Sequence, residues 1–119
     1  MRETKVYVVG HNMAGYLPDS DPYYTDDETS AKRYLYDEMD AYGDYLSEAP
    51  EDERDERWHE EEDDLSVAMG DLNYHDAPCA WSVGIRRYWI EVTTLGQLMA
   101  DNDIEAETVK DALNQLNGY

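Results

Sequence analysis

Residues 37–64 constrain this chain most, because they carry 15 carboxylates opposed by only two arginines. The segment therefore contributes −13 to a formal net charge of −20 over 119 residues. Self-repulsion at this charge works against a compact state, so a favourable contribution must offset it. The 11 tyrosines and 3 tryptophans can supply it, since their rings bury large apolar areas while their polar ends remain solvated. This aromatic content also argues against disorder, because disordered acidic chains are usually poor in aromatic residues.

The length of the chain fits a single domain, and its charge excludes several classes of partner. Nucleic acid and anionic membranes would repel so acidic a protein, which leaves basic proteins, cations and solvent. A single cysteine, Cys79, allows no internal disulfide and fits a reducing compartment. The apolar segment from Val6 to Val9 is too short for a signal peptide or a membrane span. We therefore expect a cytoplasmic protein with no direct contact to nucleic acid or membrane.

A first amphipathic helix is predicted from a capping box and an apolar stripe. Thr25 is expected to be its N-cap, with Glu28 as the reciprocal partner, and the helix is expected to end near Ser47. Apolar residues recur at spacings of three and four, which places them on one side of a helix. The stripe consists of Ala31, Leu35, Met39, Tyr42 and Leu46.

A second helix is expected to begin at Pro50, where the missing N–H costs nothing and the acidic first turn suits the helix dipole. Its C-cap is expected to be Asn73. The predicted buried line consists of Trp58, Leu65, Met69 and Leu72, with Glu62 on the same side.

Three strands are predicted from β-branched and aromatic runs. The first is Lys5 to Gly10, followed by a loop from His11 to Asp21 that continues to Tyr23 and Tyr24. The other two, Ala80 to Ile85 and Tyr88 to Val92, are expected to form a hairpin that turns around Gly84 to Arg87. In that turn Arg86 and Arg87 would either pair with the acidic face or be solvated.

The C-terminal segment is expected to form two short helices, one started by a capping box of Thr94 with Gln97 and one capped by Asp103. The predicted fold is α+β: a three-stranded antiparallel or mixed sheet with two amphipathic acidic helices on one face and a short C-terminal helical appendage. Residues 1–92 would form the α+β core, and residues 93–119 a helical extension of the same domain.

The carboxylates of both helices recur at helical spacing. Asp37, Asp40, Asp44 and Glu48 repeat every three to four residues, so successive groups lie about 6 Å apart along one face. Phosphates on one DNA strand advance about 3.4 Å along the axis while winding around it, so their true separation is of similar order. The predicted partner-binding residues are Asp37, Glu38, Asp40, Asp44, Glu48, Asp52, Asp55, Glu56, Glu60, Asp63, Tyr36 and Tyr45.

Two antiparallel helices with such faces would present two rows of negative charge, as a duplex does. Like charges at this spacing destabilise a helix by a few tenths of a kcal/mol per pair, which suggests a functional reason for them. The partner would be a basic DNA-binding protein, whose lysines and arginines normally meet phosphates. The alternatives are a structural or salt-adapted acidic domain and a weak divalent-cation binder. A homodimer formed through the C-terminal helices is also compatible with the sequence.

No catalytic constellation emerges from the residue pattern. Glu56 and His59 have the spacing of a di-iron motif, but that motif occurs once here and such sites need it twice. Residues 19–21 begin like a calcium loop that lacks its glycine and its final glutamate. His11 lies in a predicted loop without a catalytic partner. We expect no enzymatic activity, no cofactor and no metal site.

The segment Gly15-Tyr16-Leu17-Pro18-Asp19-Ser20-Asp21-Pro22, followed by an amphipathic helix, resembles a group of small acidic proteins from tailed phages of actinobacteria. In that group a strand pair beginning with a motif like Trp81-Ser82-Val83 follows the helices. The resemblance covers roughly residues 1–92 and implies a phage origin, but that group has no assigned activity. Together with the charge rows it leads to the hypothesis of a DNA mimic that inhibits a host restriction or CRISPR effector in the host cytoplasm.

Overall fold

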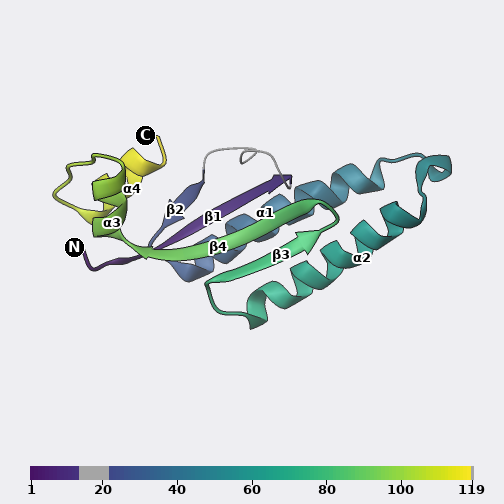
Figure 1. Cartoon of the computed structure of the whole chain (residues 1–119), viewed down its shortest axis with the longest axis horizontal. Helices are drawn as coiled ribbons and strands as arrows, with labels where there is room; N and C mark the ends of the chain where they lie inside the picture. Colours follow the sequence, from purple (N-terminus) through teal and green to yellow (C-terminus); the bar gives the residue numbers. More distant parts are fainter. Residues whose placement is uncertain (14–21, 119) are drawn as a thin grey trace.

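The computed structural model describes residues 1–13 and 22–118, and its centre is a four-stranded antiparallel sheet (Figure 1). The strands are β1 (Lys5–Met13), β2 (Tyr23–Thr25), β3 (Cys79–Val83) and β4 (Arg86–Thr94), in the order β2-β1-β4-β3. The α+β class is confirmed, but the expectation of three strands was wrong. Tyr23–Thr25, interpreted as loop, pairs with residues 7–9 of β1.

β1 continues past the expected end at Gly10, so the prediction of a loop from His11 was wrong for its first residues. Val9 and His11 lie on the same face of the strand because side chains alternate. Gly10 does not end the strand. A Cβ at this position would come within 2.5 Å of the Trp89 ring, so the ring fills the space that a side chain would need. Residues 14–21 lie outside the described residues, and with them most of the segment that carries the phage resemblance and the calcium-like residues 19–21.

α1 (Glu28–Ser47) forms as the apolar stripe predicts, with Ala31, Leu35, Met39 and Leu46 buried and Tyr42 half-buried. Its N-cap is Asp27, whose carboxylate accepts from the Ser30 N–H at 3.2 Å, so the assignment to Thr25 was wrong. Thr25 accepts instead from the Asp27 N–H, because it still belongs to β2.

α2 (Glu56–Asp71) begins six residues later than Pro50, because Pro50 precedes a separate 3₁₀ turn, η1 (Glu51–Glu53). Asp55 is the N-cap of α2 and accepts from the Trp58 N–H at 2.9 Å. A further 3₁₀ turn, η2 (Leu72–Tyr74), ends the segment, so Asn73 is not the C-cap.

The predicted buried line of α2 is confirmed at Leu65 and Leu72, and Trp58 and Met69 are partly buried against the same core. Ala68 is also buried, while Glu62 is exposed and Glu61 is half-buried in its place. Gly43 of α1 permits a close approach of the two helices, since a Cβ there would lie 3.3 Å from Leu65.

The β3–β4 hairpin is confirmed, but its turn is only Gly84 and Ile85. Arg86 and Arg87, expected in the turn, begin β4 and pair with Val83 and Ser82. Gly84 has φ of +60°, a conformation that favours glycine. β4 is longer than expected and runs to Thr94, which then caps the next helix.

The C-terminal helices are α3 (Leu95–Asp101) and α4 (Val109–Leu116). The cap of α3 by Thr94 is confirmed, but α4 is capped by Thr108 and not by Asp103. Asp103 has φ of +54°, in the turn between the helices, outside the extended region that an N-cap adopts.

These two helices are more than an appendage, because they pack against one end of the sheet face opposite to α1 and α2 (Figure 1). Val6 and Val8 pack with Leu95, Leu98 and Met99, whereas alternate β1 residues face α1. The Asn117 side chain donates to and accepts from the backbone of Tyr24, at 2.8 and 2.9 Å, and so occupies the free edge of β2.

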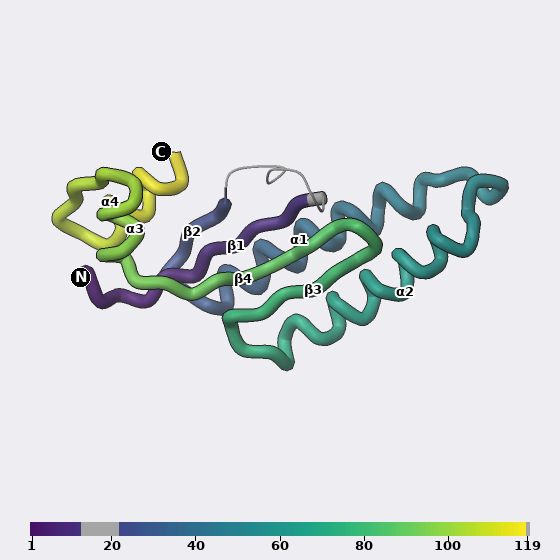
Figure 2. The backbone as a smooth tube through the Cα atoms, in the orientation of Figure 1, coloured from purple at the N-terminus to yellow at the C-terminus, as the bar shows by residue number. Residues whose placement is uncertain are grey.

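The molecule is elongated, with extents of 55 × 27 × 21 Å. Figure 2 shows α1 behind the sheet and α2 alongside β3, with the connection of the two helices projecting beyond the β3–β4 turn. α3, α4 and both chain ends lie at the opposite end. Within residues 1–13 and 22–118, no helix combines the length and apolar character needed to cross a membrane.

Candidate functional site

The outer face of α1 carries a row of four exposed carboxylates: Asp37, Asp40, Asp44 and Glu48. With 3.6 residues per turn, these positions point away from the stripe that α1 buries against the sheet. The row is therefore held by a helix whose opposite side is fixed in the core.

A second set of exposed carboxylates lies on α2 and on the connection before it. Glu56, Glu60 and Asp63 are exposed on the side of α2 away from its buried line. Asp52 and Asp55 extend this set into the connection, where both are exposed. Both helices pack on the same face of the sheet, so the two sets lie on one acidic outer layer.

These carboxylates lack a basic partner among residues 1–13 and 22–118. In the part of the chain that the structure describes, none of the nine forms an ion pair with a lysine or arginine. Glu38 differs from the rest. It is half-buried, and its carboxylate lies 3.1 Å from Nε2 of His11, so it faces the sheet and not the outer layer.

The α1–α2 connection is fastened by Arg54 and Trp58. The Arg54 guanidinium donates to the carbonyl oxygens of Ala49 and Ser47, both at 3.0 Å, and lies 4.7 Å from the centre of the Trp58 ring. Trp58 Nε1 donates to the Leu46 carbonyl at 2.8 Å. No basic residue lies in the last turn of α1, so Arg54 supplies the positive charge that a helix C-terminus favours.

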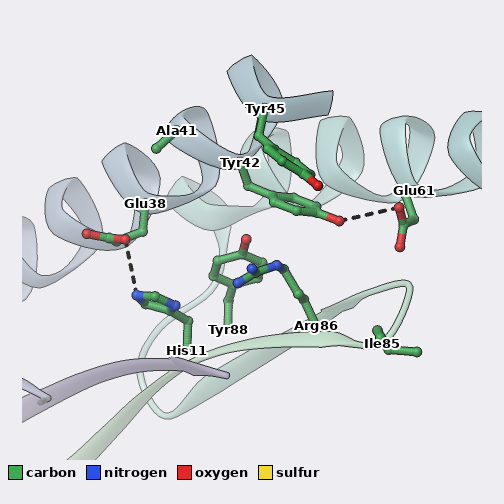
Figure 3. Close-up of a pocket in the computed structure, with 9 residues that line it drawn as sticks. All are labelled: His11, Glu38, Ala41, Tyr42, Tyr45, Glu61, Ile85, Arg86 and Tyr88. Carbon is green, nitrogen blue, oxygen red and sulfur yellow. Dashed lines mark hydrogen bonds and ion pairs between the residues drawn. The ribbon is translucent and has the colours of Figure 1, made fainter. Parts of the chain in front are cut away.

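A groove runs beside the acidic layer, between the α1–α2 end and the β3–β4 turn. It consists of two adjoining hollows of about 450 and 550 Å³ that share Tyr42, Tyr45, Glu61 and Ile85. Figure 3 shows the first hollow, with Tyr42 between Tyr45 and Arg86. Tyr45 is 69% exposed, so it forms the outer lip of the groove.

The floor of the groove is a network that joins both helices to the hairpin. The Tyr42 hydroxyl donates to Glu61 at 3.3 Å, and the Arg86 guanidinium lies 4.6 Å from the centre of the Tyr42 ring. Burial raises the pKa of Tyr42, the negative charge of Glu61 raises it further, and the positive charge of Arg86 lowers it. The Glu61 carboxylate also lies against Gly84, where any Cβ would collide with it.

Sequence reasoning missed this network because its members are distant in sequence. The sequence predicts Tyr42 in the core stripe and His11 in a loop, and for Arg86 it leaves open a pairing with the acidic face or a solvated position. The available signal was the strand alternation that continues from Val9 to His11, which would have placed His11 under α1. His11 also stacks on Tyr88, with ring centres 5.9 Å apart.

The two predicted binding tyrosines lie in different surroundings. Tyr45 stands in the groove and its ring stacks on Tyr42, with centres 5.9 Å apart and planes 19° from parallel. Tyr36 is 42% exposed and lines a separate hollow beside Lys32 and Arg33. Tyr45 thus adjoins negative groups, whereas Tyr36 adjoins positive ones.

Among the described residues, no group of three or more His, Cys, Asp or Glu side chains is arranged to hold a metal ion. His59, which shares the spacing of a di-iron motif with Glu56, is exposed and contacts the Trp58 ring edge-on. Comparison of the chain with protein-family models, curated proteins and solved structures gave no match.

Proposed function

We propose that this chain is a phage-encoded DNA mimic, which binds the basic DNA-binding surface of a host DNA-binding or defence protein and inhibits it. The outer carboxylates of α1 and α2 take the place of phosphates. The lysines and arginines of the partner, which gain affinity from phosphate contacts, would meet them instead.

The observation that carries the proposal is the exposed α1 row, which forms no ion pair with the described residues and is mounted on a helix anchored in the core. Adjacent groups lie about 6 Å apart along such a helix. A row that is already ordered loses little conformational entropy on binding, which favours affinity.

The distribution of charge favours a binding surface over a uniform acidic coat. Of 29 carboxylates, 15 lie between residues 37 and 64, and the other 14 are spread over the rest of the chain. A salt-adapted domain needs acidic groups over its whole surface, with no reason to concentrate them on one layer.

The test is capture of proteins from a host lysate on the immobilised chain, with elution by duplex DNA at constant ionic strength. The variant D37K/D40K/D44K/E48K removes the α1 row. The control E3K/E91K/E105K/E107K makes the same change in net charge at exposed positions outside α1 and α2.

The wild type and the control are expected to retain the same DNA-eluted protein, and the row variant to lose it. If the two variants lose it equally, net charge and not the row is responsible, and mimicry is wrong. Circular dichroism of both variants confirms that the fold is intact.

A further inference from the structure

We propose that the groove beside the acidic layer seats an arginine of the partner, with the guanidinium stacked on the exposed ring of Tyr45. This inference rests on the proposed function and names the side chain that the site selects.

The groove has the charge that a cation requires. Its second hollow is lined by four carboxylates and one arginine, a formal charge of −3. These charged residues are Glu48, Glu53, Asp55, Glu61 and Arg57. A guanidinium that enters would meet carboxylates contributed by the C-cap of α1, by α2 and by the connection between the helices.

The groove also has the aromatic surface that separates arginine from lysine. A planar guanidinium stacks on aromatic faces and donates in a fixed fork to carboxylates, whereas an ammonium is a compact, strongly hydrated charge. One face of Tyr45 is directed toward Tyr42, and the 69% exposure of the residue leaves much of its ring to solvent.

The protein already makes this contact twice around the groove. Arg54 lies over Trp58 at 4.7 Å, and Arg86 lies over Tyr42 at 4.6 Å. Among the described residues, no guanidinium lies over Tyr45, which continues the stack formed by Arg86 and Tyr42 (Figure 3). A partner arginine on Tyr45 would add a fourth layer to the stack of Arg86, Tyr42 and Tyr45.

The experiment uses blocked hexaarginine and hexalysine peptides as probes, with binding to the full chain measured by calorimetry at about 0.15 M salt. Both peptides carry the same charge, so attraction to an acidic protein alone gives equal affinity. The wild type is expected to bind hexaarginine about two- to fivefold more tightly.

Variants assign that preference to the groove. Tyr45→Ala is expected to abolish the preference without weakening hexalysine binding, and Tyr45→Phe to retain it because the ring remains. Tyr36→Ala is the matched control, since it removes an exposed tyrosine of the same helix outside the groove. The variant D37K/D40K/D44K is expected to bind both peptides more weakly and to leave the ratio of the two affinities unchanged.

Equal affinity of the two peptides for the wild type, or an unchanged preference in Tyr45→Ala, overturns the arginine site. Neither result bears on capture of a DNA-eluted protein, which tests the proposed function separately. Conversely, an arginine preference that depends on Tyr45 supports the site even if no such protein is captured.

Discussion

Arg54→Ala should loosen the end of the helical pair that carries much of the acidic layer. The substitution removes the hydrogen bonds to the carbonyls of Ser47, the last residue of α1, and of Ala49 just after it, and the contact with the Trp58 ring. It leaves the core untouched, because Arg54 is half-buried and packs on the connection. The variant is therefore expected to keep its fold and to lose stability at the α1–α2 connection.

The size of the loss follows from these contacts. Two partly exposed hydrogen bonds contribute about 0.5 kcal/mol or slightly more each, and the cation–π contact contributes about 0.5–1 kcal/mol. The free energy of unfolding should fall by about 2 kcal/mol. Unfolding entropies of about 2.1 cal/mol/K per residue translate this into a decrease in Tm of about 8 °C.

Urea unfolding followed by circular dichroism measures this loss, with hydrogen exchange of the connection as a local readout. Urea is preferred to guanidinium chloride because a salt would screen the charges. Arg57→Ala is the matched control. It removes the same charge three residues away, from an exposed side chain without hydrogen bonds or ion pairs in the described part of the chain. Equal destabilisation by both variants would refute the fastening role.

Four further outcomes are expected. Gly10→Ala should lower the free energy of unfolding in urea by about 1–3 kcal/mol, because its Cβ would overlap the Trp89 ring. Gly70→Ala, in open space on α2, should raise the free energy of unfolding by about 0.5–1 kcal/mol. The opposite order of stability would contradict the packing. At pH 8, Cys79 of the folded protein should react with iodoacetamide more slowly than Cys79 of the urea-unfolded chain, and its rate should increase as the pH rises. The reason is that burial raises the pKa of the thiol and so lowers the thiolate fraction. Equal rates in the folded and unfolded chains would contradict this. Tm should rise between about 10 and 150 mM salt and then level off as repulsion is screened, whereas a need for molar salt would favour the salt-adapted alternative.

The helices were predictable because their signals are local. Ala31, Leu35 and Met39 repeat with the period of one helix face, and tertiary contacts did not alter that result. The cap was harder, since Thr25 and Asp27 are both good caps and the choice depends on where β2 ends. β2 itself is three residues whose strand character comes from pairing with β1.

The second helix shows the same limit. Pro50 and Asp55 are both signals for a helix start, and the chain uses the first for a 3₁₀ turn and the second for α2. Between the two signals, the Arg54 side chain donates hydrogen bonds to carbonyls five and seven residues earlier. These contacts follow no periodic pattern in the sequence and therefore could not be predicted from it.

The acidic row was predictable for the same reason as the apolar stripe, because the residues of each recur every three to four positions along one helix. Glu38 departs from this because its helix position faces His11, a residue that strand alternation carries under α1. The groove could not be predicted, because it forms only where Tyr42, Glu61 and Arg86 meet from three elements distant in sequence.

The most direct measurement of the central claim is displacement of a labelled duplex from the captured protein, followed by fluorescence anisotropy. Wild-type chain and the E3K/E91K/E105K/E107K control should release the duplex at similar concentrations, with an efficiency that falls steeply as salt increases. The D37K/D40K/D44K/E48K variant should not release it. Release by that variant at the wild-type concentration would show that the α1 carboxylates do not stand in for phosphates.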